Sequence, residues 1–167
     1  GQLDPYAYNE FVFGFLTQHD NDYLTELHQL FMQKVIRPQM RPKGFDAIKK
    51  HQDLGHTIVG ITATSDFITA PIFREFGITE ILATNAEVAD GKYTGKVAGL
   101  ACYQKGKLAR LDAWLEGRNV SESWAYSDSI NDRFLLEYAT HAIAVNPDDR
   151  LEKLAQEHNW DIQDWSI

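Results

Sequence analysis

The sequence predicts an α/β fold organised around a parallel sheet of the doubly wound type. From residue 44 onward, short β-branched or apolar runs alternate with longer amphipathic runs, which is the order of strands and helices in such folds. The strand-like runs are apolar along most of their length, as expected for strands that helices cover on both faces. Together the two observations favour a helix-flanked sheet over an all-helical or all-β domain.

The N-terminal quarter follows a different, helical pattern. Apolar residues recur at helical spacing in two stretches, residues 9–16 and 23–35. Asp22, in the polar turn between them, is the candidate N-cap of the second helix. Pro38 and Pro42 then interrupt the helical pattern. We therefore interpret residues 1–40 as a small helical segment and residues 41–167 as the α/β core.

Within the core, predicted helices and strands alternate in order along the chain. The helices are expected at residues 45–54, 66–76, 105–116, 132–138 and 148–158. The strands are expected at residues 57–61, 80–83, 123–126 and 141–145. Asp90-Gly91, inside the β-prone stretch 88–97, is a hairpin signal. Since doubly wound sheets bind ligands beyond the carboxyl ends of their strands, the residues that follow these strands form the expected functional rim.

Composition narrows the classes of function. The 167 residues suffice for one domain with a real core, and 44% of them are hydrophobic and 24% charged. A net charge of −8 without a basic run disfavours nucleic-acid and anionic-membrane partners. The lone Cys102 excludes an internal disulfide, and the six histidines lack metal-ligand spacing. With no apolar run near the ~20 residues of a membrane span and no signal peptide, we expect a cytoplasmic protein; its oligomeric state is not readable.

The first candidate for chemistry is a pair of carboxylates. Asp128 and Asp132 lie four residues apart, where the predicted strand 123–126 gives way to a helix. Hard divalent cations such as Mg²⁺ prefer oxygen ligands, so this pair is a candidate metal site. Asp and Asn are also favoured at helix starts, so helix capping is the alternative interpretation.

Two further candidates concern phosphate. Thr62 directly follows the predicted strand 57–61, and the small residues after it open a helix, an arrangement that can bind phosphate through a hydroxyl and backbone N–H groups. The alternative is again a capping run. Lys107 lies near a helix start, where its charge opposes the helix dipole, so a role elsewhere is indicated. A solvated lysine is the alternative, and Lys105 or Arg110 could serve instead.

In this order, the hydroxyl, the lysine and the paired acids make the sequence resemble the haloacid dehalogenase (HAD) superfamily of phosphohydrolases. The likeness is to its phosphoserine-phosphatase-like branch, subfamily IB. It rests also on the segments Ile-Thr-Ala-Thr-Ser-Asp-Phe, Asp-Gly-Lys-Tyr-Thr-Gly, Gly-Lys-Leu-Ala-Arg-Leu-Asp, Tyr-Ser-Asp-Ser-Ile-Asn-Asp and Ala-Val-Asn-Pro-Asp. The resemblance implies a three-layer, Rossmann-like core in residues 41–167, with residues 1–40 as the C-terminal part of a helical cap.

The resemblance also implies an activity, which is Mg²⁺-dependent hydrolysis of a small phosphomonoester through an aspartyl-phosphate intermediate. Phosphoserine-like and histidinol-phosphate-like substrates both fit. Asp128 would ligate Mg²⁺, and Asp132 would hold its second shell. The residues implied in binding phosphate or substrate are Thr62, Ala63, Thr64, Lys107 and Asn131. Those implied in catalysis are Thr62, Lys107, Asp128 and Asp132.

One departure from the family pattern matters for the function. The family's first motif, Asp-x-Asp-x-Thr or Val after an apolar strand, supplies the nucleophile, and it is not found here. Residues 20–25 imitate it with one residue too many and without a preceding strand. The chain therefore resembles a piece that starts after the first strand, and we expect it to be inactive alone. The alternatives are a non-catalytic HAD-fold binding or interaction module and a protein assembled from two chains.

The same departure leads to an expectation about the sheet. In the family's fold, the first strand is central and lies between the strands predicted at 57–61 and 123–126. We therefore expect either a gap between these two strands or an additional strand from another segment. Unpaired backbone groups at such a gap cost about 1–3 kcal/mol each when buried, so we do not expect residues 1–167 alone to form a stable monomer.

Overall fold

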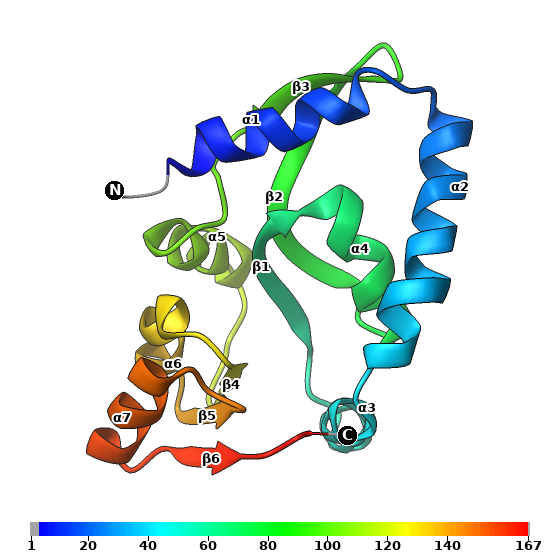
Figure 1. The fold of residues 1–167 in the computed structure, drawn as a ribbon. Helices are drawn as coiled ribbons and strands as arrows, with labels where there is room; N and C mark the ends of the chain where they lie inside the picture. The colour runs from blue at the N-terminus through cyan, green and yellow to red at the C-terminus, as the bar shows by residue number, and fades with distance from the viewer. Residues whose placement is uncertain (1–3, 167) are drawn as a thin grey trace.

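The strands form two separate three-stranded sheets in a computed structural model that describes residues 4–166 (Figure 1). The first sheet has the order β1 (Val59–Ser65), β2 (Glu80–Ala89), β3 (Lys92–Ala98). The second has the order β4 (Trp124–Ser127), β5 (His141–Val145), β6 (Asp161–Gln163). Neighbouring strands run parallel in the second sheet and between β1 and β2, whereas β2 and β3 are antiparallel.

Seven α-helices accompany the sheets in the described part of the chain. They are α1 (Pro5–Leu16), α2 (Asn21–Phe31), α3 (Pro42–Asp53), α4 (Asp66–Glu75), α5 (Lys105–Leu115), α6 (Arg133–Tyr138) and α7 (Asp149–His158). A π-helical turn (Met32–Ile36) and two 3₁₀ turns (Arg37–Gln39 and Ile130–Asp132) complete the set. Within residues 4–166, no helix combines the length and apolar character that a membrane crossing requires.

The predicted helices are present, with differences at their ends. The N-cap of α2 is Asp20 rather than Asp22, because the Asp20 carboxylate accepts the Tyr23 N–H at 2.8 Å. The helix predicted from residue 45 begins at Pro42, since proline fits the first turn of a helix, where its missing N–H costs no hydrogen bond. The expected hairpin is confirmed, because Asp90 and Gly91 both adopt positive φ, as in a type I′ turn.

Two predicted strands are too short. β1 does not end at Ile61 but continues to Ser65, and β2 continues beyond Ala83 into the hairpin. The register between them pairs Ile61 with Leu82 and then Ser65 with Thr84. Four steps along β1 therefore match two along β2, which is a bulge over residues 62–64. Thr62 consequently lies inside an irregular strand and not after it.

Each sheet has its own hydrophobic core. The first core joins α1 and α2 to β2 through Phe13, Leu16, Leu24 and Ala86. The second joins α6, β5 and α7 through Leu136, Ala142, Ala144, Leu151 and Ala155. The sequence analysis missed β6, whose three residues are too few and too polar to show a strand pattern.

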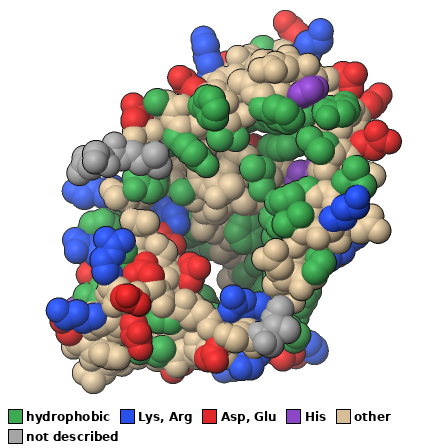
Figure 2. Space-filling model, viewed as in Figure 1, with side chains coloured by type: hydrophobic (Ala, Val, Ile, Leu, Met, Phe, Trp, Pro, Cys, Tyr) green, Lys and Arg blue, Asp and Glu red, His purple; other side chains and the backbone are tan. Residues whose placement is uncertain are grey.

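The predicted gap between two strands is present. Among residues 4–166, β1 pairs only with β2 and β4 only with β5, so the expected parallel strands form two sheets rather than one (Figure 1). Figure 2 shows a hollow on this face, with hydrophobic side chains gathered along α1 and α2 beside it. The exposed large hydrophobic residues of these two helices are Tyr6, Tyr8, Phe11, Phe15, Tyr23, Leu27 and Leu30.

Candidate active site

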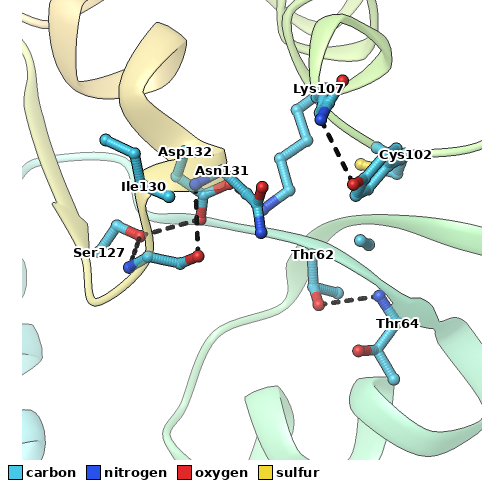
Figure 3. A network of polar contacts seen from close by, with 12 residues as sticks. Thr62, Thr64, Cys102, Lys107, Ser127, Ile130, Asn131 and Asp132 are labelled. Carbon is cyan, nitrogen blue, oxygen red and sulfur yellow. Dashed lines mark hydrogen bonds and ion pairs between the residues drawn. The ribbon is translucent and has the colours of Figure 1, made fainter. Parts of the chain in front are cut away.

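Lys107 is the one charged residue in the buried set of the described chain. It is the third residue of α5 and only 7% exposed. Its ammonium forms an ion pair with Oδ1 of Asp132, and their side chains are 9% and 15% exposed (Figure 3). Since burying an unpaired charge is costly, the pairing explains why this lysine can be buried at a helix start. The sequence candidates Lys105 and Arg110 lie elsewhere: Lys105 is exposed, and Arg110 donates to the Leu100 carbonyl.

Asp132 has both carboxylate oxygens occupied. It closes the 3₁₀ turn after β4, and its Oδ2 accepts a hydrogen bond of 2.9 Å from the Ser127 hydroxyl. The Ser127 oxygen also accepts the Ser129 N–H at 3.2 Å. Asp132 is therefore held between Lys107 of α5 and Ser127 of β4. We call the first sheet with its core the first half of the molecule and the second sheet with its core the second half. Because α5 also contacts β1 and β2, the Lys107–Asp132 ion pair joins the two halves.

Asp128 differs from Asp132 in having a free carboxylate. It directly follows β4 and is exposed. Its backbone carbonyl accepts the Asp148 N–H at 2.8 Å, whereas its carboxylate has no hydrogen bond or ion pair within residues 4–166. Of the two acids, Asp128 is the one that can take a new ligand without breaking a contact.

Thr62 lies in the bulge of β1, close to this network in Figure 3, and its side chain points toward Thr64. The Thr62 hydroxyl accepts the Thr64 N–H at 3.2 Å, which fixes the bulge locally. The Ala63 carbonyl accepts the Thr84 hydroxyl at 3.0 Å, which ties the bulge to β2.

Two buried residues behind the bulge were not assigned a supporting role by the sequence analysis. Thr84 is fully buried, and its hydroxyl oxygen also accepts the Cys102 N–H at 3.0 Å. The Cys102 thiol donates to the Leu82 carbonyl, and burial raises its pKa although Lys107 lowers it. Cys102 is thus a neutral supporting thiol. A threonine within an apolar strand was the only sequence signal for the Thr84 contact.

The acids fit a magnesium ion only in part. Within the described residues, no cluster of three or more His, Cys, Asp or Glu side chains could hold a metal by itself. The chain offers the free carboxylate of Asp128, with the fully engaged Asp132 four residues on. Because Mg²⁺ is commonly held by one or two carboxylates together with waters and substrate phosphate, this donor set is chemically suitable for it.

Comparison with protein families gives one clear match. The model of haloacid dehalogenase-like hydrolases covers residues 1–137 of the chain. Among curated proteins, a histidinol-phosphatase of Neisseria meningitidis is 36% identical over 97% of this chain and 76% of its own length. A phosphoserine phosphatase of Mycobacterium tuberculosis is 42% identical over 86% of this chain, which spans only 47% of that protein.

Solved structures agree with the family match. A protein of unknown function from Bordetella pertussis Tohama I is 38% identical and has a TM-score of 0.94, covering 99% of this chain and 77% of its own. A phosphoserine phosphatase determined as a phospho-aspartyl intermediate analogue is 25% identical with a TM-score of 0.53, over 73% of this chain and 57% of its own. The arrangement of helices and strands is therefore that of known HAD structures.

Proposed function

The chain belongs to the haloacid dehalogenase-like hydrolase family, and from this premise we propose that the protein containing it is a Mg²⁺-dependent phosphatase of small phosphomonoesters. The observation that carries the proposal is the buried ion pair of Lys107 with Asp132, four residues from the free carboxylate of Asp128. The relatives named for phosphoserine and histidinol phosphate support substrates of those two kinds.

Each side chain has a distinct role in this proposal. Asp128 would ligate Mg²⁺, and Asp132 would keep Lys107 in place and belong to the second shell of the metal. The bound metal would neutralise charge on the phosphoryl group. The Lys107 ammonium faces the phosphoryl oxygens and stabilises the charge that they carry in the transition state.

The phosphoryl group is bound by the bulge and the loop after β4. The Thr62 hydroxyl donates to a phosphoryl oxygen, because rotation about its C–O bond leaves the hydroxyl hydrogen available while the oxygen accepts from Thr64. The Ala63 and Thr64 segment lies against the phosphate, and Asn131 orients the loop or the substrate. Asn131 is exposed, which suits contact with a ligand.

The nucleophile in this proposal is an aspartate outside these 167 residues. Its carboxylate attacks phosphorus and the P–O ester bond breaks, while the second Asp of the family's first motif gives a proton to the ester oxygen, which leaves as the alcohol. Water then cleaves the aspartyl-phosphate to inorganic phosphate, and the second Asp takes the proton that this water loses. The related structure that mimics a phospho-aspartyl intermediate supports this route. We further propose that α1 and α2 are the C-terminal part of a helical cap, since their exposed apolar side chains are suited to packing against additional helices.

The test uses the full-length protein, including the coding sequence upstream of residue 1. We expect release of phosphate from phosphoserine or histidinol phosphate with Mg²⁺ and none with a chelator. Lys107→Ala should lower turnover roughly 10²-fold, as loss of one preorganised electrostatic group does. Lys105→Ala, an exposed lysine two residues earlier, is the matched control and should retain activity.

Two results would contradict the proposal. Full turnover in Lys107→Ala would remove the role assigned to that ammonium. Absence of an upstream Asp-x-Asp-x-Thr or Val segment, together with no phosphatase activity on a panel of phosphorylated metabolites, would favour the non-catalytic interaction module.

A further inference from the structure

Asp148 makes more contacts than a helix N-cap requires. It precedes α7, and its Oδ1 accepts the N–H groups of Arg150 and Leu151, both at 3.0 Å. Its second oxygen, Oδ2, points out of the helix and accepts the Ile130 N–H at 2.9 Å. Its own N–H donates to the Asp128 carbonyl at 2.8 Å. Asp148, which lies between β5 and α7, therefore makes two hydrogen bonds to the loop that follows β4.

Two other aspartates in the described chain cap a helix with their carboxylate, and both lack this second function. Asp4 caps α1 and Asp20 caps α2 with a single carboxylate oxygen each. Within the described chain, the second oxygen of each of these caps has no hydrogen bond or ion pair. Capping a helix thus accounts for Oδ1 of Asp148 but not for Oδ2.

The two hydrogen bonds of Asp148 engage the two peptide groups on either side of Ser129. They fix the Asp128 carbonyl and the Ile130 N–H, and the Ser127–Asp132 hydrogen bond fixes the far end of the same loop. We call residues 128–132 the acid loop. Held at both ends, it has little freedom to change the spacing between its two carboxylates.

We propose that Asp148 is a positioning residue, which holds the acid loop in the shape that lets Asp128 and Asp132 serve one Mg²⁺ site. This inference rests on the proposed function, because it takes Asp128 as the metal ligand. Asp148 itself touches neither metal nor substrate. It acts through the backbone of Asp128 and Ile130, and so links the carboxyl ends of β4 and β5.

The first test replaces Asp148 by serine in the full-length protein. Serine is a good N-cap, but its single side-chain oxygen cannot take the place of Oδ1 at the start of α7 and of Oδ2 beside Ile130 at once, so Asp148→Ser keeps the cap and loses the Ile130 contact. The matched control is Asp20→Ser, the same change at the cap of α2, far from the acid loop in sequence. Amide hydrogen exchange of Ile130 is measured without metal, and Mg²⁺ affinity is measured by titration calorimetry without substrate.

We expect Asp148→Ser to raise the rate of amide hydrogen exchange at Ile130 about tenfold, since a hydrogen bond to a charged acceptor is lost. We expect the affinity for Mg²⁺ to fall by about the same factor. Amides in the middle of α7 should stay protected. Asp20→Ser should change neither quantity. Unchanged Ile130 exchange, or unchanged Mg²⁺ affinity with faster exchange, would overturn the inference.

A second variant removes the donor instead of the acceptor. Ser129 is extended, with φ −122° and ψ 135°, which suits a residue before proline, so Ile130→Pro can delete the N–H at the first position of the 3₁₀ turn. Ile130→Val keeps the N–H and is its control. Normal Mg²⁺ affinity in Ile130→Pro would contradict the inference.

Failure of the proposed function gives a different pattern. In that case neither the wild-type protein nor any variant takes up Mg²⁺, and Asp128→Asn changes nothing. Failure of the inference alone leaves Mg²⁺ binding that Asp128→Asn weakens and Asp148→Ser does not.

Discussion

The two sheets of this protein are built in different ways. The core of the first sheet joins Phe13 of α1 to Ala86 of β2, which are far apart in the sequence. The core of the second sheet lies wholly between Leu136 and Ala155, in α6, β5 and α7. The second half can therefore assemble from local contacts, whereas the first requires the N-terminal helices to fold back onto the hairpin.

Polar and aromatic contacts join the halves where strand pairing does not. The Lys107–Asp132 ion pair is one contact. His51 at the end of α3 provides another, because its Nε2 lies 2.8 Å from the Tyr126 hydroxyl of β4. His56, whose Nδ1 lies 2.9 Å from Nδ1 of His51, also stacks on Trp124 at 4.7 Å. Such contacts depend on charge state and geometry more than a shared hydrophobic core does.

The largest effects should come from emptying either core. In the full-length protein, Phe13→Ala should lower the free energy of unfolding by about 3–5 kcal/mol and Leu151→Ala by about 2–5 kcal/mol, because both side chains are fully buried. Hydrogen exchange by segment distinguishes them. We expect Phe13→Ala to expose β2 and β3 first and Leu151→Ala to expose β5 first. Uniform loss of protection in both variants would mean that the halves unfold as one unit.

A smaller effect is expected at the start of α5, which positions Lys107. A Cβ at Gly106 would lie 2.2 Å from the Ala101 carbonyl oxygen, so Gly106→Ala must shift the start of α5. We expect lower stability by calorimetry and weaker pairing with Asp132. Gly14→Ala is the control, because nothing lies within 4 Å of its added Cβ in α1. It should stabilise the helix by about 0.5–1 kcal/mol.

The histidine contact between the halves should make stability depend on pH. Burial, with the nearby His56 and Lys50, lowers the pKa of His51 below 6.5. The unfolded chain then binds a proton more readily, so this contribution to stability is complete above pH 6.5 and is lost as the pH falls through the lowered pKa. Denaturant titrations at several pH values give the free energy of unfolding as a function of pH. This dependence should be flatter for His51→Gln than for the wild type.

Tyr126→Phe separates titration from the hydrogen bond in that experiment. It keeps the imidazole of His51 and removes its hydroxyl partner. The free energy of unfolding should therefore drop, while its slope against pH stays as in the wild type. An identical slope in the wild type and in His51→Gln would exclude His51 as the source.

The smallest effect is expected for Cys102→Ser. The thiol is fully buried, its pKa is raised by burial, and no step of the proposed reaction uses it. Turnover of the full-length protein should be nearly unchanged in a phosphate-release assay. Inactivation with the fold intact by circular dichroism would point instead to a thiol mechanism.

The sequence alone predicted most of the helices and strands, and among its candidate residues were Lys107 and Asp132, which the structure pairs. Hydrophobic period and turn residues are local properties, so α5, β5 and the Asp90-Gly91 hairpin could be located from them. The family resemblance likewise rests on short motifs, and the family match agrees with it.

Only the tertiary structure decided how these pieces meet. The bulge around Thr62 depends on pairing with Thr84 of β2, and β6 exists only because β5 offers it an edge. The pairing of Lys107 with Asp132 joins residues 25 positions apart, and the two contacts of Asp148 join residues 18 and 20 positions apart. Periodicity cannot reveal such contacts, since their partners are chosen by how strands and helices pack in three dimensions.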